Sequence, residues 1–375
     1  MNENLRQILP NPIETVKSLD TVIIGQLQAK KTLALMLFNR AMLRLSNEGY
    51  IDTDVRLQKS NVLLIGSTGV GKTSLIKALG DIADIPIHIT DVTNLTGTGC
   101  VGDNLIDELV HHVNNTEEWL LSNEQRFLDE GVFTVGVDEP LEVIQQTAEN
   151  GIICLDEIDK IAIRDKQKEE FSTGIIQNEL LRMLEGNYCR FSTVNKLPCK
   201  LSGIDTTNLT FVCLGAFSGL QEIVYERLNK SHGVGFSSDL SFRINKEEDL
   251  NSLLPYVKTE DLIKYGFKAE FLGRITAKAV LQDLNLEMME EIIVKPTNSV
   301  LKQYESMFKA LDIELIVEKE AIQEIANAAL KLKAGARSLK GLFDRIFTDY
   351  LYNVFEYQDK KLVITKSIIK EKCNL

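Results

Sequence analysis

The sequence predicts an α/β fold with a parallel sheet core, followed by a small α/β domain at the carboxyl end. Asn61–Thr73 reads NVLLIGSTGVGKT, a short apolar run that leads into a glycine-rich loop. Gly151–Lys160 reads GIICLDEIDK, a second apolar run that ends in two acids. From about Asp283 the pattern changes to long amphipathic segments with two short apolar runs, IELIV and KLVIT. Short continuous apolar runs are typical of parallel strands buried on both faces.

The loop after the first apolar run matches G-x-x-x-x-G-K-[ST] and precedes the helix-compatible stretch SLIKALGDIA. Glycines let backbone N–H groups turn toward a phosphate, and the following helix presents its positive end to the same anion. Lys72 can reach the β- and γ-phosphates, and the Thr73 hydroxyl can ligate Mg²⁺. An ordinary glycine-rich turn is the alternative, but the strand before and the helix after favour a nucleoside triphosphate site. Its predicted residues are Ser67, Thr68, Gly69, Val70, Gly71, Lys72, Thr73 and Ser74.

Two adjacent carboxylates, Asp156 and Glu157, follow the second apolar run. A buried strand ends in such a pair where the acids meet a cation at the carboxyl edge of the sheet. There Asp156 can hold the Mg²⁺ ion of the nucleotide, and Glu157 can polarise the attacking water. A solvated loop is the other interpretation, which the phosphate loop upstream disfavours.

The totals are those of a soluble globular protein with 375 residues, of which 44% are hydrophobic and 26% charged. This length accommodates two domains, each with its own core. A net charge of −12 argues against a general nucleic-acid or anionic-membrane surface, which would need clustered positive charge. The six cysteines show no C-x-x-C pair or metal-ligand spacing, so we expect reduced thiols in a cytoplasmic protein. The sequence shows neither a signal peptide nor an apolar run of membrane-spanning length.

Residues 1–18 are expected to form an extended lead-in, because Pro10 and Pro12 disfavour a helix. A large domain is expected over 19–282, with a helix after Gln26 and further strands at IPIHITD and NLTFVCLG. Within it, residues 105–150 mix helical pattern with acidic loops. A small domain is expected over 283–375.

These motifs together resemble the ClpX-type AAA+ unfoldases and, more distantly, HslU. The resemblance runs from LPNPIETVKSLDTVIIGQLQAKK through GARSLKGL. GSTGVGKT and ICLDE match the Walker A and Walker B motifs of that family. It implies an AAA+ P-loop ATPase with a C-terminal lid domain, which uses ATP and Mg²⁺ to unfold proteins.

The resemblance also assigns roles outside these two motifs. The segment that matches Ile24, Gly25 and Gln26 lies against the adenine in the family. EFLGR, which ends at Arg274, matches the segment that carries an arginine finger into the neighbouring subunit's site. GARSLK, with Arg337, matches the sensor-2 motif of the small domain. A guanidinium suits both tasks, since it can donate two hydrogen bonds to phosphate oxygens.

An arginine supplied by a neighbour implies a closed ring of copies, which is a hexamer in the family. The family's pore loop matches the segment with Cys100, Val101 and Gly102, where Cys100 replaces an aromatic residue and predicts a weaker grip on polypeptide. The hydrophobic-Gly-Phe tripeptide that docks on a ClpP peptidase matches Val234, Gly235 and Phe236.

Several features depart from the family. The stretch 101–151 is longer, Glu169 stands near a usual basic position, and the Arg-Lys-His loop and the amino-terminal zinc domain are not visible. The end of NLTFVCLGAF offers no assignable sensor-1 residue. These departures keep open a second hypothesis, a nucleotide-gated remodelling factor or scaffold without processive translocation. A clamp-loader-like ATPase on nucleic acid is disfavoured by the acidic composition.

Overall fold

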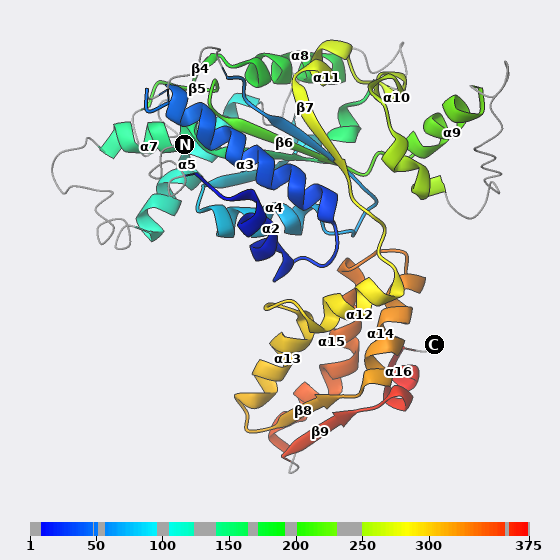
Figure 1. The fold of residues 1–375 in the computed structure, drawn as a ribbon. Helices are drawn as coiled ribbons and strands as arrows, with labels where there is room; N and C mark the ends of the chain where they lie inside the picture. Colours follow the sequence, from blue (N-terminus) through cyan, green and yellow to red (C-terminus); the bar gives the residue numbers. More distant parts are fainter. Residues whose placement is uncertain are drawn as a thin grey trace. The chain divides into compact units, whose positions relative to one another are not determined.

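The computed structural model describes residues 9–47, 49–51, 57–95, 105–123, 140–163, 172–191, 201–230, 250–356 and 360–373. The chain divides into two compact units, and Figure 1 draws their helices and strands with most of them labelled. Unit 1 comprises Met1–Thr15, Gln28–Gly66 and Leu79–Val280. Unit 2 comprises Val16–Leu27, Ser67–Ala78 and Leu281–Leu375.

Unit 1 is built on a five-stranded parallel sheet in the order β2-β3-β6-β1-β7. Its strands are β1 (Asn61–Ile65), β2 (Ile87–Asp91), β3 (Ile152–Asp156), β6 (Thr210–Gly215) and β7 (Ile275–Val280). Every residue of β1 and β6 is buried, as their continuous apolar sequence predicts. The expected α/β architecture with a parallel sheet core is therefore confirmed.

Helices and short turns connect these strands. They are α3 (Leu27–Asn47), α4 (Lys72–Ala83), α5 (Leu105–Ser122), α7 (Pro140–Glu149), α8 (Ser172–Glu185), α9 (Leu220–Lys230), α10 (Thr259–Tyr265), α11 (Ala269–Gly273) and the 3₁₀ turns η1 (Val92–Asn94), η2 (Ile158–Ile161) and η4 (Leu250–Tyr256). A two-stranded antiparallel sheet pairs β4 (Tyr188–Arg190) with β5 (Gly203–Asp205).

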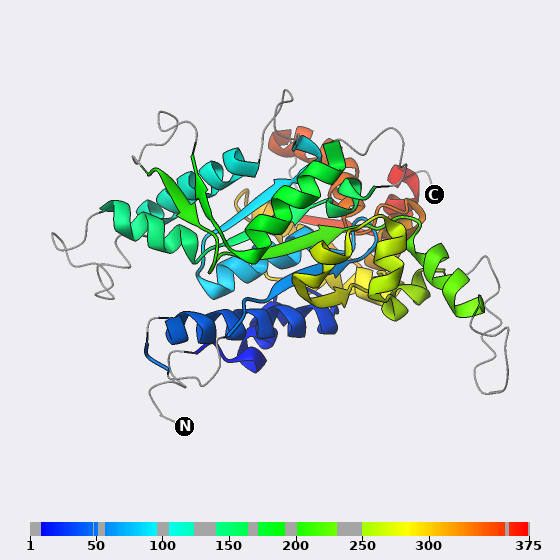
Figure 2. The same ribbon diagram turned by 90° about the horizontal axis from the view of Figure 1, so that it is seen from above.

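One face of the large sheet contributes alternate residues, such as Leu63, Ile153 and Phe211, to a core that also contains Leu109 of α5 and Leu180 of α8. Figure 2 shows α8 lying over the strands. Successive residues of a strand point to opposite faces, so this alternation is the expected one. The amphipathic helices therefore cover a sheet that is apolar on both sides.

The expectation of extended chain before Ser18 is wrong over α2 (Pro12–Asp20). Pro12 opens this helix rather than interrupting it. Proline is tolerated in the first helical turn, where its missing N–H needs no partner and its fixed φ suits the helix. Asn11 supports the start, because its Oδ1 accepts a hydrogen bond from the backbone N–H of Ile13 at 3.0 Å.

The carboxyl-terminal part of unit 2 consists of α12 (Leu286–Val294), α13 (Val300–Lys309), α14 (Lys319–Lys331), α15 (Arg337–Tyr352), η5 (Val354–Glu356) and α16 (Lys366–Cys373), with the parallel strands β8 (Glu314–Val317) and β9 (Lys361–Ile364). The side chains of Asn285 and Ser299 cap α12 and α13. Aromatic rings in contact with one another, including Phe308, Phe343 and Phe347, contribute to the core between the helices. Over the residues that the structure describes, no helix is both long and apolar enough to cross a membrane.

A histidine cluster joins β2, α5 and the end of α7. His88 on β2 donates from Nε2 to Glu108 on α5 at 2.9 Å, and its Nδ1 lies 2.8 Å from the amide nitrogen of Asn115. His112, fully buried on α5, donates from Nε2 to the carbonyl of Ala148 at 2.9 Å. Its Nδ1 has no hydrogen-bond partner within the described ranges. Burial, helped by the nearby His88, lowers the pKa of His112 from 6.5 to about 4, although the Ala148 contact opposes this shift.

This depressed pKa predicts a loss of stability in mild acid. Below pH 6.5 His112 is protonated in the unfolded chain but stays neutral in the folded chain. The free energy of unfolding therefore decreases as the pH falls from 6.5 toward 4. Between pH 7 and pH 5 this group alone should lower the free energy of unfolding by about 2 kcal/mol. His112→Gln keeps a donor for the Ala148 carbonyl and should remove that slope in denaturant titrations at the two pH values. His111→Gln, at an exposed neighbour, is the control; equal slopes in all three proteins would refute the assignment.

Candidate nucleotide-binding and hydrolysis site

The predicted phosphate loop begins where β1 ends. The backbone N–H of Gly66 donates to the Gly215 carbonyl at 3.2 Å, which ties the start of the loop to the end of β6. Gly69 and Gly71 have φ values of +82° and +97°, which residues with a β-carbon rarely adopt. Helix α4 starts at Lys72, whose Nζ lies 3.0 Å from the carbonyl oxygen of Ser67. The loop therefore has the backbone form and the helix start that anion binding requires.

Within unit 2 this loop lies against the residues that precede α15. The carbonyl of Gly69 accepts a hydrogen bond from the N–H of Ala336 at 3.0 Å. A β-carbon on Gly69 would lie 2.1 Å from the carbonyl oxygen of Ala334, and one on Gly335 would lie 2.5 Å from that of Gly69. Only glycines permit this approach. Arg337 directly follows Ala336, has an exposed side chain and is the first residue of α15.

The predicted adenine segment also belongs to unit 2. Gly25 and Gln26 both have positive φ, and Gln26 is buried. The Gln26 amide exchanges two hydrogen bonds of 2.8 Å with the backbone of Gln282. Because both ends of that side chain are engaged, Gln26 ties the Ile24–Gln26 segment to the backbone at Gln282.

The acidic pair lies at the carboxyl end of β3. Asp156 pairs in register with Asp91 of β2, and β6 separates β3 from β1. Since all these strands are parallel, Asp156 lies at the sheet edge where Gly66 begins the phosphate loop. Glu157 is exposed with φ of +56°, and its N–H donates to Asp156 Oδ1 at 2.8 Å. A non-glycine residue in this conformation is held there by its surroundings, as is common at active sites.

Sequence reasoning missed a third carboxylate, Asp159, although it follows in the same run of acids. It is buried, and its Oδ1 accepts a hydrogen bond from the N–H of Ala216 at 3.1 Å, directly after β6. Its Oδ2 has no hydrogen-bond partner in the part of the chain that the structure describes. Gly215 is needed here, because a β-carbon would lie 2.8 Å from Asp159 Oδ1. A carboxylate from η2 therefore occupies the end of β6, where the sequence offered no polar residue.

Arg274 lies between α11 and β7 in unit 1. Its Nε and one terminal nitrogen both donate to Oε1 of Glu185, the last residue of α8, at 3.0 and 2.6 Å. About half of each side chain is accessible (52% and 42%). An ion pair this exposed contributes little stability, so a phosphate can compete for the guanidinium.

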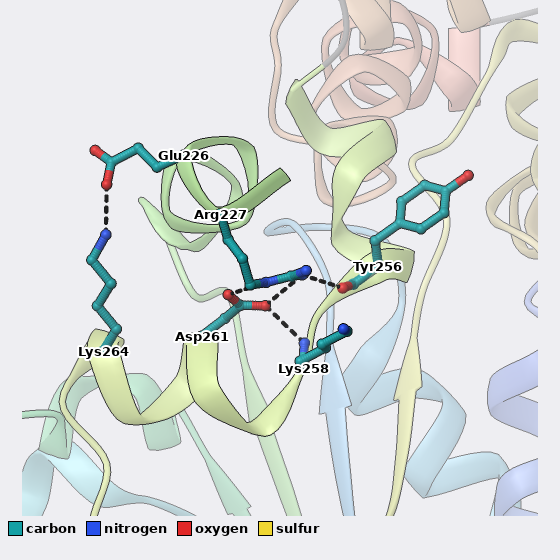
Figure 3. Close-up of polar contacts among 6 residues, drawn as sticks. All are labelled: Glu226, Arg227, Tyr256, Lys258, Asp261 and Lys264. Atoms are coloured by element: carbon teal, nitrogen blue, oxygen red, sulfur yellow. Dashed lines mark hydrogen bonds and ion pairs between the residues drawn. The ribbon is translucent and has the colours of Figure 1, made fainter. Parts of the chain in front are cut away.

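A partly buried ion pair joins α9 to α10, the helix that precedes α11 in the chain (Figure 3). Arg227 donates two hydrogen bonds to the carboxylate of Asp261, at 2.7 and 2.9 Å, and one to the Tyr256 carbonyl at 2.7 Å. Burial alone would raise the pKa of Asp261, but the hydrogen bonds from Arg227 and from the N–H of Lys258 hold that pKa below its ordinary value. Such a two-pronged contact is geometrically specific.

The structure thus groups the predicted residues in two sets. Unit 2 contains the Ile24–Gln26 segment, the phosphate loop through Ser74, and Arg337. Unit 1 contains Asp156, Glu157 and Arg274. The predicted pore-loop residues Cys100, Val101 and Gly102, the docking tripeptide Val234, Gly235 and Phe236, and Glu169 lie outside the described residues.

By their chemistry, the residues of each set suit a magnesium nucleotide. The loop in unit 2 offers turned backbone N–H groups and a lysine that would hold phosphates, and Thr73 in unit 2 and Asp156 in unit 1 each offer a hard oxygen donor that Mg²⁺ would accept. In the described ranges no group of three or more His, Cys, Asp or Glu side chains could hold a metal ion alone.

Comparison with known proteins agrees with this geometry. Residues 57–278 match the model of the AAA domain (Cdc48 subfamily), and residues 284–360 match that of the C-terminal, D2-small domain of ClpB protein. The chain is 34% identical over 371 residues to the ATP-dependent Clp protease ATP-binding subunits ClpX of Borrelia duttonii (strain Ly) and Borrelia recurrentis (strain A1), covering 96% of this chain and 79% of each relative. The ClpX subunit of Treponema denticola is 33% identical over 368 residues, covering 96% of this chain and 81% of the relative. The chain therefore belongs to the AAA ATPase family, is similar to the ClpX subunits within it, and is an ATPase.

Proposed function

We propose that this chain is an ATP-driven protein unfoldase that works as a ring, with a hexamer as its expected form. The observation that carries the proposal is the position of Arg274, an exposed guanidinium that follows α11 and is held by Glu185 at the end of α8. An arginine displayed in this way is suited to enter the site of an adjoining copy, and such a contact requires head-to-tail interfaces that close into a ring.

The proposed division of labour follows from the chemistry of each side chain. The phosphate loop and Lys72 bind the β- and γ-phosphates, while Thr73 and Asp156 hold Mg²⁺, which neutralises phosphate charge when bound. Glu157 orients and polarises the attacking water. Arg337 in cis and Arg274 in trans offset negative charge that develops on the phosphate oxygens.

A ClpP-like peptidase is the proposed downstream partner, and cytoplasmic proteins are the proposed substrates. Support comes from the relatives, whose names describe ATP-binding subunits of a Clp protease, and from the tripeptide Val234-Gly235-Phe236. Cys100 and the longer 105–150 segment favour the alternative, a remodelling factor that rearranges a specific complex without threading it.

One experiment separates the two functions. The purified chain, checked for size with saturating ATP, is given a tagged, stably folded fluorescent substrate with and without a ClpP peptidase. An unfoldase should abolish the fluorescence in an ATP-dependent manner and, with the peptidase, degrade the substrate. Steady ATP consumption with persistent fluorescence would favour the remodelling factor. A monomer that hydrolyses no ATP would end both proposals.

A further inference from the structure

Gln177 on α8 is a fully buried polar residue that joins two segments far apart in the sequence. Its Nε2 donates to the carbonyls of Ile161 at 2.7 Å and Gly266 at 3.2 Å. Its Oε1 accepts a hydrogen bond from the backbone N–H of Lys268 at 3.0 Å. All three partners are main-chain groups, so the amide acts on backbone position.

The first segment begins at Glu157, the predicted catalytic carboxylate. The carbonyl of Glu157 accepts a hydrogen bond from the N–H of Lys160 at 2.9 Å, which closes the turn η2. The turn ends at Ile161, and it is this residue's carbonyl that Gln177 holds. A shift of the backbone at Glu157 is therefore carried by one tight turn to Gln177.

The second segment leads to Arg274. Lys268 precedes the five residues of α11, and Arg274 follows them. The Lys268 side chain also donates to α8, at the Gly174 carbonyl (3.2 Å) and at Asn178 (2.8 Å). At its other end α8 holds Arg274 through Glu185. Helix α8 thus contacts both Lys268, where this second segment begins, and Arg274, where it ends.

A direct backbone contact locks the two segments together beside Gln177. The N–H of Ile163 donates to the Gly266 carbonyl at 2.9 Å. Gly266 has φ of +126°, and a β-carbon there would lie 2.5 Å from the Ile163 carbonyl oxygen. The ring of Phe267 packs against those of Phe217 and Phe271, at 5.8 and 5.6 Å between centroids. Close-packed contacts of this kind move together rather than deform separately.

We propose that Gln177 is a positioning residue that couples the backbone of the Glu157 segment to the placement of Arg274, so that each subunit's own site governs the arginine it offers to its neighbour. The proposal rests on the roles proposed above for Glu157 and Arg274. Gln177 touches neither nucleotide nor water in this scheme; it acts through the two backbone segments that it joins.

A double-mutant cycle tests this coupling. Gln177→Met has similar volume and removes all three hydrogen bonds. In assembled rings it should lower kcat about tenfold and leave KM within about twofold, because the phosphate loop is untouched. In an Arg274→Ala background the same change should cost at most about twofold, since Gln177 then has no arginine to position. The Hill coefficient for ATP should exceed one in the parent chain and fall toward one in Gln177→Met.

Two further variants guard against a trivial loss of folding. Thr116→Val removes a buried hydrogen bond on α5, far along the chain from Gln177. When it replaces Gln177→Met in the cycle, its effect on kcat should be the same in the parent and in the Arg274→Ala background. Gln177→Glu keeps the acceptor for Lys268 and loses the donors, so its kcat should fall between those of the parent and Gln177→Met. Thermal melting of every variant sets the assay temperature below the transition.

Each outcome decides between the proposals. Equal fold losses in both backgrounds, or a parent chain without cooperativity, would overturn the coupling while leaving the proposed function in place. An Arg274→Ala variant with unchanged kcat in intact rings would overturn the arginine's role and the coupling together.

Discussion

Replacing Glu157 with Gln should lower kcat for ATP hydrolysis by about 10²–10⁴-fold while leaving nucleotide affinity within about twofold. The substitution removes the negative charge that polarises water and keeps the shape of the side chain. It leaves in place the hydrogen bond from the backbone N–H of residue 157 to Asp156, and Gln tolerates the φ of +56° no worse than Glu. The Glu157→Gln protein should therefore still bind the nucleotide but hydrolyse it very slowly.

Phosphate release and titration with a fluorescent nucleotide measure the two properties. The control is Glu222→Gln, an exposed acid on α9, which should change neither. A Glu157→Gln protein that hydrolyses ATP at about half the parent rate or more would remove Glu157 from the catalytic role.

Replacing Arg274 with Ala should lower kcat about 10³-fold in rings that still assemble, if the guanidinium stabilises the transferring phosphoryl group of a neighbour. The structure allows a sharper form of this prediction. A ring that mixes Arg274→Ala with Glu157→Gln subunits contains junctions where an intact Glu157 faces an intact Arg274 from the next copy. Mixing two inactive proteins should therefore restore hydrolysis, which no arginine acting in cis could do.

The matched control is Lys264→Ala. Lys264 is also an exposed cation in an ion pair, 2.5 Å from Glu226, and its loss should leave turnover unchanged. Light scattering on each mixture verifies the size of the rings. Mixtures that assemble and stay inactive would place Arg274 outside the neighbouring site.

Patterns local in sequence predicted β1, β2, β3 and β6 of the large sheet, but missed β7, whose sequence ITAKAV is not continuously apolar. The runs around Leu63 and Cys154 are continuously apolar because both faces of those strands are covered. The helix at Pro12 was missed because proline disrupts a helix interior but favours the first turn of a helix. The hydrogen bond from the Ile13 N–H to Asn11, seen only in the structure, shows that Pro12 lies in the first turn.

The sequence indicates a candidate site residue where that residue lies in a contiguous motif, as Lys72 and Asp156 do. Gln177 and Asp159 have no such signal. Their partners are main-chain N–H and carbonyl groups at positions such as 216, 266 and 268, and no residue type at those positions indicates such a hydrogen bond in the sequence. Burial in the folded chain, rather than residue type, gives these two residues their importance.

The parallel pairing of β8 with β9 sets the order in which the carboxyl-terminal domain can form during synthesis. Glu314 aligns with Lys361 and Val317 with Ile364, so α14 and α15 must both be made before β8 acquires its only hydrogen-bonded neighbour in the described sheet. Until Ile364 has left the ribosome, β8 offers an open edge to other nascent chains. Premature termination before β9 should therefore yield aggregates rather than a shortened but folded protein.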